Sequence, residues 1–294
     1  MRILYLGLPL GVEVLRRAGH APAVVGLGHL DAPGRRRAFV RARGALILGK
    51  PDLEAPDVRA AIDSARCDVL LSWFWPRRVP GSLLASMPRG AFGVHPSLLP
   101  RWRGPDPYYH AIRAGDAETG VTLHRLDPEY DTGEIIEQTR LAIAPDENAW
   151  QLARRLDRPS LALLVRAADR LAKGEALAGR PQDPALITEA PRPDDDALAL
   201  SFHTDVASIL RAVRAGAPAP GATALIEDLL VVVSRASRWT GSIPAALEPS
   251  EAFATPHGLA VRAADGAVLL EDIEDEDGAR LVGAETNALI ADRP

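Results

Sequence analysis

The sequence predicts a two-domain α/β protein, in which a parallel sheet flanked by helices precedes a small all-β domain. In the first half, short apolar runs alternate with helical stretches, a pattern typical of a parallel α/β sheet. A stretch rich in proline and aspartate, residues 181–197, interrupts this alternation. After it the apolar runs become short and closely spaced, as they are in all-β domains.

The elements of the first domain follow from these patterns in order. Parallel strands are predicted over residues 2–7, 22–28, 44–50, 67–73 and 90–95. Helices are predicted over residues 11–19, 55–65 and 107–115, and a hairpin over 120–127 and 132–143. Residues 147–174 predict a long amphipathic helix with a break near Pro159, because proline removes a backbone donor and clashes with the preceding turn.

The second domain is predicted to be a small β-barrel that follows one helix. The helix is predicted over residues 205–216, and the β-strands within 222–237, 258–273 and 279–285. The Ala-Asp-Gly sequence at 264–266 lies between two apolar runs and indicates a hairpin. We therefore expect the domains to be residues 1–185 and 201–294, with a linker at 186–200.

Composition limits the class of protein. The chain has 294 residues and a net charge of −5, which gives no sign of a nucleic-acid-binding protein. Its single cysteine, Cys67, excludes an intrachain disulfide and a cysteine metal cluster, and no histidines have metal-ligand spacing, so we expect no metal. No apolar run is long enough for a membrane helix, and the chain begins directly with a strand pattern, so a cytoplasmic protein is expected.

Three stretches are candidates for chemistry. Gly7 to Gly11 is either a phosphate-binding turn or a tight strand-to-helix turn; it lacks the spacing of a dinucleotide motif, which favours the tight turn. His95 ends a predicted strand on the side where open α/β sheets bind ligands, and a proline-punctuated loop follows it. Asp131 lies in an Asp-Thr-Gly sequence that by itself indicates only a turn.

These stretches carry a resemblance. The blocks HPSLLPRWRG, AGDAETGVT and DTGEI occur in this order between residues 79 and 138, and they resemble the folate-dependent formyltransferases. The opening strand and residues 210–225 are more weakly similar to the two-domain branch that includes methionyl-tRNA formyltransferase. The resemblance implies a Rossmann-like formyltransferase domain followed by an OB-like barrel, and 10-formyltetrahydrofolate as the formyl donor.

The resemblance also implies a mechanism in which an amine attacks the formyl carbon and an oxyanion forms. The family uses an asparagine, a histidine two residues later and the aspartate of the Asp-Thr-Gly segment. His95 and Asp131 match the last two, whereas Gly93 stands at the asparagine position. Losing one such donor costs about 10²–10³ in rate. Either another group fills the space, or the enzyme is slow on a specialised acceptor, or the chain binds folate without transferring the group.

The same resemblance places the ligand sites. The residues implied in folate binding are Trp75, Arg77, Arg78, Val79, Pro128, Glu129 and Tyr130. The aromatic residues Trp73 to Trp75 either pack in the core or stack on the pterin ring. Arg101 and Arg103 flank the loop after His95, and they either contact an anionic group of the acceptor or are solvated.

The charge of the second domain bears on the acceptor. Residues 201–294 contain seven arginines, no lysine and fourteen acidic residues, a net charge of −7. Such a domain is a poor partner for the phosphates of tRNA. We therefore expect a small-molecule amine as the acceptor, such as an amino sugar, an amino acid or a biosynthetic intermediate, with tRNA formylation as the alternative. The acidic domain could also serve a homodimer or a basic protein partner.

Overall fold

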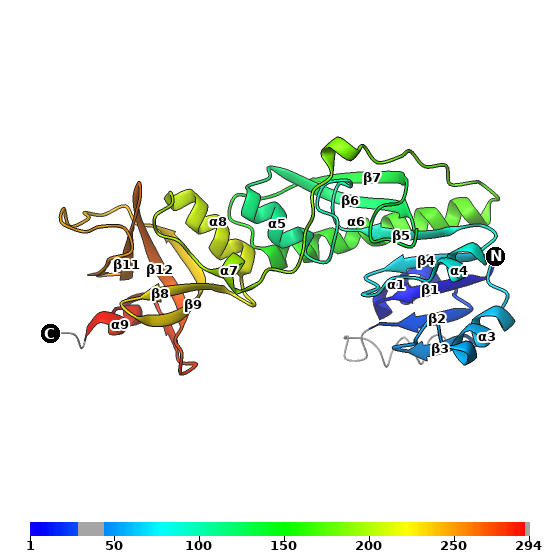
Figure 1. Cartoon of the computed structure of the whole chain (residues 1–294), viewed down its shortest axis with the longest axis horizontal. Coiled ribbons are helices and arrows are strands. Elements are labelled where there is room, and N and C mark those ends of the chain that lie inside the picture. The colour runs from blue at the N-terminus through cyan, green and yellow to red at the C-terminus, as the bar shows by residue number, and fades with distance from the viewer. Residues whose placement is uncertain (29–43, 292–294) are drawn as a thin grey trace. The chain divides into compact units, whose positions relative to one another are not determined.

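The computed structural model describes residues 1–28 and 44–291 of the chain (Figure 1). They form two compact units. The first comprises Met1–Pro107, Glu118–Ala142 and Arg154–Ala190, and the second Tyr108–Ala117, Ile143–Ala153 and Pro191–Pro294. Within the described ranges, no helix has both the length and the apolar character that crossing a bilayer requires.

The first unit is built on a seven-stranded sheet in the order β3-β2-β1-β4-β5-β6-β7. Strands β1 to β5 pair in parallel, whereas β6 and β7 are antiparallel additions at one edge. The strands span Ile3–Gly7 (β1), Val24–Leu27 (β2), Leu46–Gly49 (β3), Val69–Trp73 (β4), Ala91–His95 (β5), Glu118–Arg125 (β6) and Ile135–Ala142 (β7). This is the parallel-dominated α/β sheet that the alternating pattern predicts.

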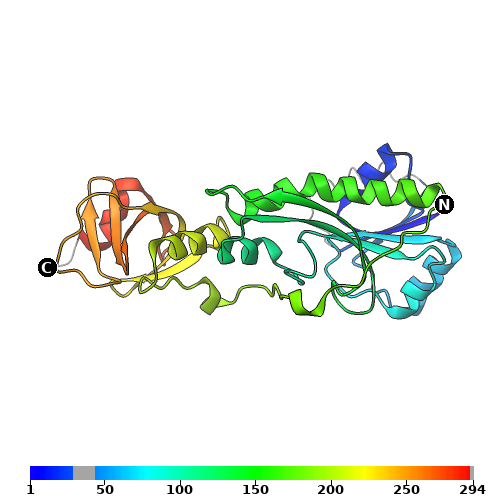
Figure 2. The ribbon, with the colours of Figure 1, turned by 90° about the horizontal axis from the view of Figure 1, so that it is seen from above.

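Helices cover both faces of this sheet. α1 (Pro9–Arg17) and α6 (Ala149–Ala172) lie over one face, and α3 (Pro56–Ser64) and α4 (Gly81–Ala85) over the other (Figure 2). The buried strand residues are mostly Leu, Val and Ile, as expected for strands covered on both sides. At Gly7 a Cβ would lie 1.8 Å from the carbonyl oxygen of Trp73, so the segment from Gly7 is a tight strand-to-helix turn.

The predicted break in the long helix is wrong. α6 runs without interruption from Ala149 to Ala172, with Pro159 inside it. Buried side chains lie on both sides of the proline, among them Leu156, Leu163 and Leu164. Because one apolar stripe continues past Pro159, the packing of that stripe outweighs the loss of a single backbone hydrogen bond.

The second unit contains a six-stranded antiparallel sheet in the order β10-β11-β12-β9-β8, with β13 paired to β12. Its strands span Ala222–Ile226 (β8), Leu229–Arg238 (β9), Ala252–Thr255 (β10), Gly258–Ala263 (β11), Gly266–Glu274 (β12) and Arg280–Val282 (β13). α8 (Val206–Gly216) packs its buried residues on this sheet, and Asp205 caps it by accepting from the Ser208 amide. Short elements complete the chain: α5 (Pro107–Ala114), α7 (Asp195–Leu198) and α9 (Ala288–Ala291).

Candidate active site

One face of the sheet carries four site residues on two neighbouring strands. β5 and β6 are antiparallel, with Gly93 directly opposite His124 and His95 directly opposite Thr122. Opposed residues point to the same face, and so do residues two apart along a strand. The register therefore gathers His95, Thr122 and His124 on one face beside Gly93.

Asp131 reaches this face from the loop that joins β6 to β7. Its Oδ2 accepts a hydrogen bond from the Gly104 amide at 3.0 Å and lies 3.4 Å from Nδ1 of His95. Its Oδ1 lies 3.7 Å from Nε2 of His124. The side chains of His95 and His124 are only 7% and 3% exposed, and that of Asp131 is 17% exposed. The two residues predicted as catalytic thus lie together, and His124 joins them.

The other ring nitrogen of each histidine faces a backbone carbonyl. Nε2 of His95 donates to the Trp102 oxygen at 2.8 Å, and Nδ1 of His124 donates to the Arg125 oxygen at 2.9 Å. Since a carbonyl oxygen only accepts, these nitrogens carry the hydrogens. In the neutral form of each ring, the other nitrogen carries no hydrogen, and its lone pair faces Asp131.

Burial lowers the pKa of His124 from its ordinary value, and the positive form of His95 acts in the same direction. The carboxylate of Asp131, the Arg125 carbonyl and the carboxylate of Asp127 oppose that shift without reversing it. His124 is therefore neutral at pH 7, with its Nε2 free to take up a proton.

The loop after His95 is rigid, as its prolines predict. Ser97 Oγ donates to the Arg101 oxygen at 2.6 Å, which closes the loop on itself. Thr122 on β6 fixes the loop by two hydrogen bonds: its hydroxyl donates to the Ser97 oxygen and accepts from the Leu99 amide. Gln138 donates to both the Leu99 oxygen and the Thr122 hydroxyl. Sequence reasoning missed Thr122 and Gln138, because their role depends on strand register.

Arg103, predicted as acceptor-binding, makes a different set of contacts. Its Nε and one terminal nitrogen donate to Oε1 of Gln182 at 3.1 and 2.8 Å. Nε2 of Gln182 in turn donates to the backbone oxygens of Asp131 and Gly133, both at 2.7 Å. Arg103 and Gln182 therefore connect the loop after His95 with the loop that carries Asp131. Arg101 stacks on the neighbouring Trp102 ring, with 4.2 Å from its guanidinium carbon to the ring centre.

The chain just beyond Gln182 also packs on the loop after His95. The Arg103 amide donates to the Thr188 oxygen, and the Ala190 amide donates to the Arg103 oxygen. Ala190 is fully buried, and a Cβ on Gly104 would lie 2.8 Å from its oxygen. This part of the proline-rich stretch is thus fixed to the site, although its composition resembles that of a linker.

Gly93 leaves no empty space above it. A Cβ at this position would lie 2.7 Å from Cδ2 of Leu126 and 3.2 Å from Nε2 of His124. The space beside Gly93 is therefore taken by other side chains of the chain, in line with the alternative that another group fills it. The volume belongs to the imidazole opposite and to Leu126.

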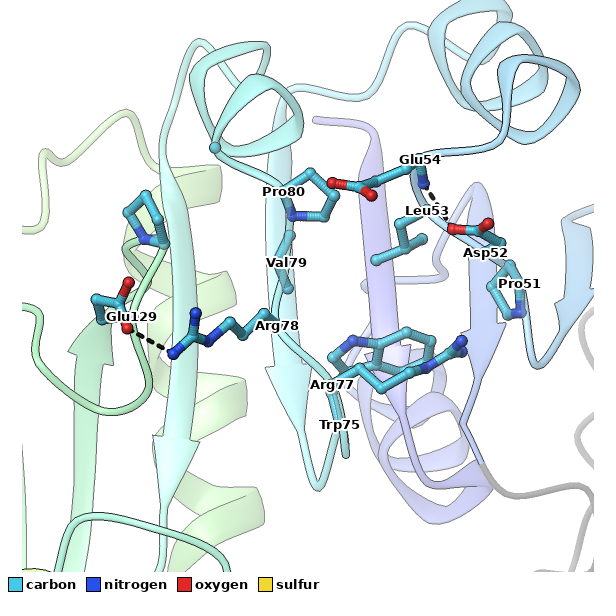
Figure 3. A pocket seen from close by; sticks show the side chains of 12 residues that line it. Pro51, Asp52, Leu53, Glu54, Trp75, Arg77, Arg78, Val79, Pro80 and Glu129 are labelled. Carbon is cyan, nitrogen blue, oxygen red and sulfur yellow. Dashed lines mark hydrogen bonds and ion pairs between the residues drawn. The ribbon is translucent and has the colours of Figure 1, made fainter.

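A pocket of about 380 Å³ lies at the carboxyl edge of the parallel strands, where open α/β sheets bind ligands (Figure 3). Six of the seven residues predicted to bind folate line it, and the exception is Tyr130. They are Trp75, Arg77, Arg78, Val79, Pro128 and Glu129. The remaining lining residues are Pro51, Asp52, Leu53, Glu54, Pro80 and Gly81.

Two of the polar residues that line the pocket are paired with each other. Arg78 and Glu129 form an ion pair at 2.7 Å (Figure 3). Arg78 also stacks on the Tyr130 ring. Both ion-pair partners are more than half exposed, so a ligand can displace the pair at a cost of about 0–1 kcal/mol. Arg77 lies over the Trp75 ring.

The aromatic residues before this pocket lie in two different environments. Trp73 is 2% exposed and belongs to the core. Trp75 lines the pocket, and its buried indole N–H has no hydrogen-bond partner among the described residues. An indole with one unpaired donor at a pocket wall suits a flat, polar ring.

Two family models match the chain: the formyl transferase model over residues 23–168 and the formyl transferase C-terminal domain model over residues 194–288. The methionyl-tRNA formyltransferase of Nitrosospira multiformis is 31% identical over an alignment 301 residues long, gaps included, and this alignment covers 97% of this chain and 95% of that protein. The chain therefore belongs to the formyl transferase family, and it is an enzyme of the formyltransferase class.

Solved structures of low sequence identity share the fold. HypX from Aquifex aeolicus in complex with tetrahydrofolic acid aligns with a TM-score of 0.65 and 18% identity over 99% of this chain. The chain spans about half of HypX, since the alignment covers 47% of that protein. An N-formyltransferase from Helicobacter canadensis, in complex with folinic acid and dTDP-3-aminofucose, aligns with a TM-score of 0.66 and 15% identity, covering 92% of this chain and 98% of that one.

Proposed function

We propose that this enzyme transfers the formyl group of 10-formyltetrahydrofolate to the amine of a small-molecule acceptor. The observation that carries the proposal is the carboxylate of Asp131 held between two buried imidazoles, two residues after Glu129, which lines a pocket with an unpaired indole donor. Folate compounds are named in the titles of the HypX and Helicobacter canadensis structures. The fit of the pocket to a pterin ring rests on Trp75 and on the displaceable pair of Arg78 and Glu129.

The reaction requires a site that holds one proton. The donor supplies an electrophilic formyl carbon; the acceptor amine loses a proton as its new bond to that carbon forms, and the folate nitrogen that leaves gains one. Nδ1 of His95 lies 3.4 Å from the Asp131 carboxylate and, in the neutral ring, has a lone pair that can take up the proton. The N–H that results donates a charge-assisted hydrogen bond to that carboxylate. Asp131 then stabilises the imidazolium until the proton is passed on.

The charges of the second unit favour a small acceptor over tRNA. Three of its arginines are in ion pairs with acids of the same unit: Arg235 with Glu271, Arg238 with Asp265, and Arg280 with Asp272. Guanidinium groups that are already in ion pairs attract the phosphates of tRNA less strongly, and the net charge around them is negative. We assign the acceptor role to an amine small enough to be bound by the first unit, with Arg101 as a candidate contact for an anionic group.

Formylation of methionyl-tRNA is the second candidate. It is the activity named for the relative from Nitrosospira multiformis, and the similarity to that protein includes both family models. The two candidates share the donor and the proton-holding residues and differ only in what delivers the amine.

Donor binding tests the proposal without knowledge of the acceptor. Calorimetry with 5-formyltetrahydrofolate, a stable analogue, should give a dissociation constant in the micromolar range. Trp75→Ala should weaken binding by about tenfold, because it removes a stacking surface and its buried area. Trp150→Ala is the matched control, since Trp150 is 53% exposed and does not line the pocket. Absence of binding at millimolar ligand would rule the proposal out.

A further inference from the structure

No step of the proposed reaction has so far been assigned to His124, although its side chain lies among the site residues. It is directly opposite Gly93, and its Nε2 faces Oδ1 of Asp131. A neutral histidine in an apolar core would normally have its polar atoms satisfied by fixed partners. Here Nδ1 has such a partner in the Arg125 carbonyl, whereas Nε2 faces a carboxylate that cannot donate to it when ionised.

Asp131 therefore has the same relation to both histidines. Each ring donates from one nitrogen to a backbone carbonyl and turns the other toward the shared carboxylate. A proton added to either ring gives a new N–H that points at Asp131. The arrangement can hold one extra proton on either ring, and the Gly104 amide keeps the carboxylate in place between them.

We propose that His124 is a positioning residue that shares the transferred proton with Asp131 and occupies the volume that a side chain at position 93 would take. The inference rests on the proposed function and extends it, because it gives a role to the imidazole that lies opposite Gly93. Glycine opposite histidine is then a matched pair: a Cβ at position 93 would lie only 3.2 Å from Nε2 of His124, so the imidazole would have to shift to accommodate a side chain there.

The groups around His124 define its titration. Asp131, Asp127 and the Arg125 carbonyl favour its positive form, while burial and a positive His95 oppose it. Leu126 lies against the same side of Gly93 and adds apolar surface. The competing view is that the imidazole only fills space above a glycine, and in that case its chemistry would not matter.

Nitrogen NMR of the ring atoms separates these views. The full chain labelled with ¹⁵N-histidine is titrated from pH 8 down to the lowest pH at which it stays folded, and His124→Gln assigns the His124 signals. We expect a neutral His124 at pH 7 with its hydrogen on Nδ1, and a pKa below the ordinary value of a histidine. In Asp131→Asn the pKa of His124 should move lower still, because the carboxylate that favours the positive ring is gone. An unchanged His124 titration in Asp131→Asn would overturn the inference.

Activity supplies the second arm. His124→Phe keeps the volume of the side chain and removes both nitrogens, so the rate of formyl transfer should fall by about 10²-fold. His124→Gln keeps a polar side chain that cannot titrate, so the pH profile of this variant should lose its acidic limb. His203→Phe is the control. Full activity with an unchanged pH profile in His124→Phe would mean that the ring is only a filler. The NMR arm needs no acceptor, so a failure of the proposed function and a failure of this inference are distinguishable.

Thermal stability tests the shared volume. Gly93→Asn should lower the melting temperature, because its side chain meets Leu126 and the imidazole. Adding His124→Ala to Gly93→Asn should recover part of that loss, giving a non-additive pair. Strict additivity of the two changes would contradict the matched pair.

Discussion

Asp131→Asn is expected to lower formyl transfer by about 10³–10⁴-fold while leaving the fold intact. The amide oxygen still accepts the Gly104 hydrogen bond, so the loop keeps its place. What is lost is the charge that stabilises a protonated His95 or His124. Steady-state rates with saturating donor, combined with a melting curve, measure the two effects separately.

The matched control is Asp127→Asn in the same loop. Asp127 accepts from the Thr132 hydroxyl at 2.6 Å, a bond that asparagine preserves. It forms neither imidazole pair, and its charge acts on His124 more weakly than that of Asp131. Its variant should stay within a few-fold of the wild-type rate. His95→Ala should lose as much activity as Asp131→Asn, and the double variant little more, because the two residues act as a unit. A fully active Asp131→Asn enzyme would show that the assigned site is wrong.

Gly133→Ala should cost about 2–4 kcal/mol of stability and most of the activity. A Cβ on Gly133 would lie 1.9 Å from the Arg125 carbonyl oxygen, and a backbone atom cannot move aside as a flexible side chain can. That same oxygen accepts from Nδ1 of His124, and Gly133 itself accepts from Gln182. The clash therefore disturbs two hydrogen bonds near Asp131: the one from His124 to the Arg125 oxygen and the one from Gln182 to the Gly133 oxygen.

Gly278→Ala provides the comparison for that experiment. Gly278 has a φ of +80°, and a Cβ there would meet nothing within 4 Å, so alanine brings backbone strain of about 1 kcal/mol without a clash. Denaturant unfolding of both variants measures the difference. If Gly133→Ala is no less stable than Gly278→Ala, the close approach at Gly133 does not limit the loop.

Much of the fold could be predicted because its signals are local. The apolar runs that end at Gly7, Trp73 and His95 are strands, and the hairpin at Asp265 forms between β11 and β12. Pro159 shows where local reasoning fails: a residue that disfavours helix is outweighed by burial along the whole of α6. β10 escapes prediction because its four residues carry no distinct alternation.

The site was only partly predictable. His95 and Asp131 lie in sequence blocks that resemble a known family, and the structure brings the two side chains together. His124 and Gln182 could not be found in this way. The role of His124 follows from the β5–β6 register, and that of Gln182 from a chain segment that returns 51 residues after Asp131. Contacts of this kind depend on the folded backbone, which short patterns do not encode.

Formyl transfer from 10-formyltetrahydrofolate is expected to end on a small amine. The most direct test supplies the purified enzyme with donor labelled in the formyl carbon, together with methionyl-tRNA and a panel of amino acids and nucleotide-linked amino sugars. We expect the label in a small-molecule product, and its loss in the Asp131→Asn enzyme. Label that accumulates on methionyl-tRNA, with none on any small amine, would contradict the account.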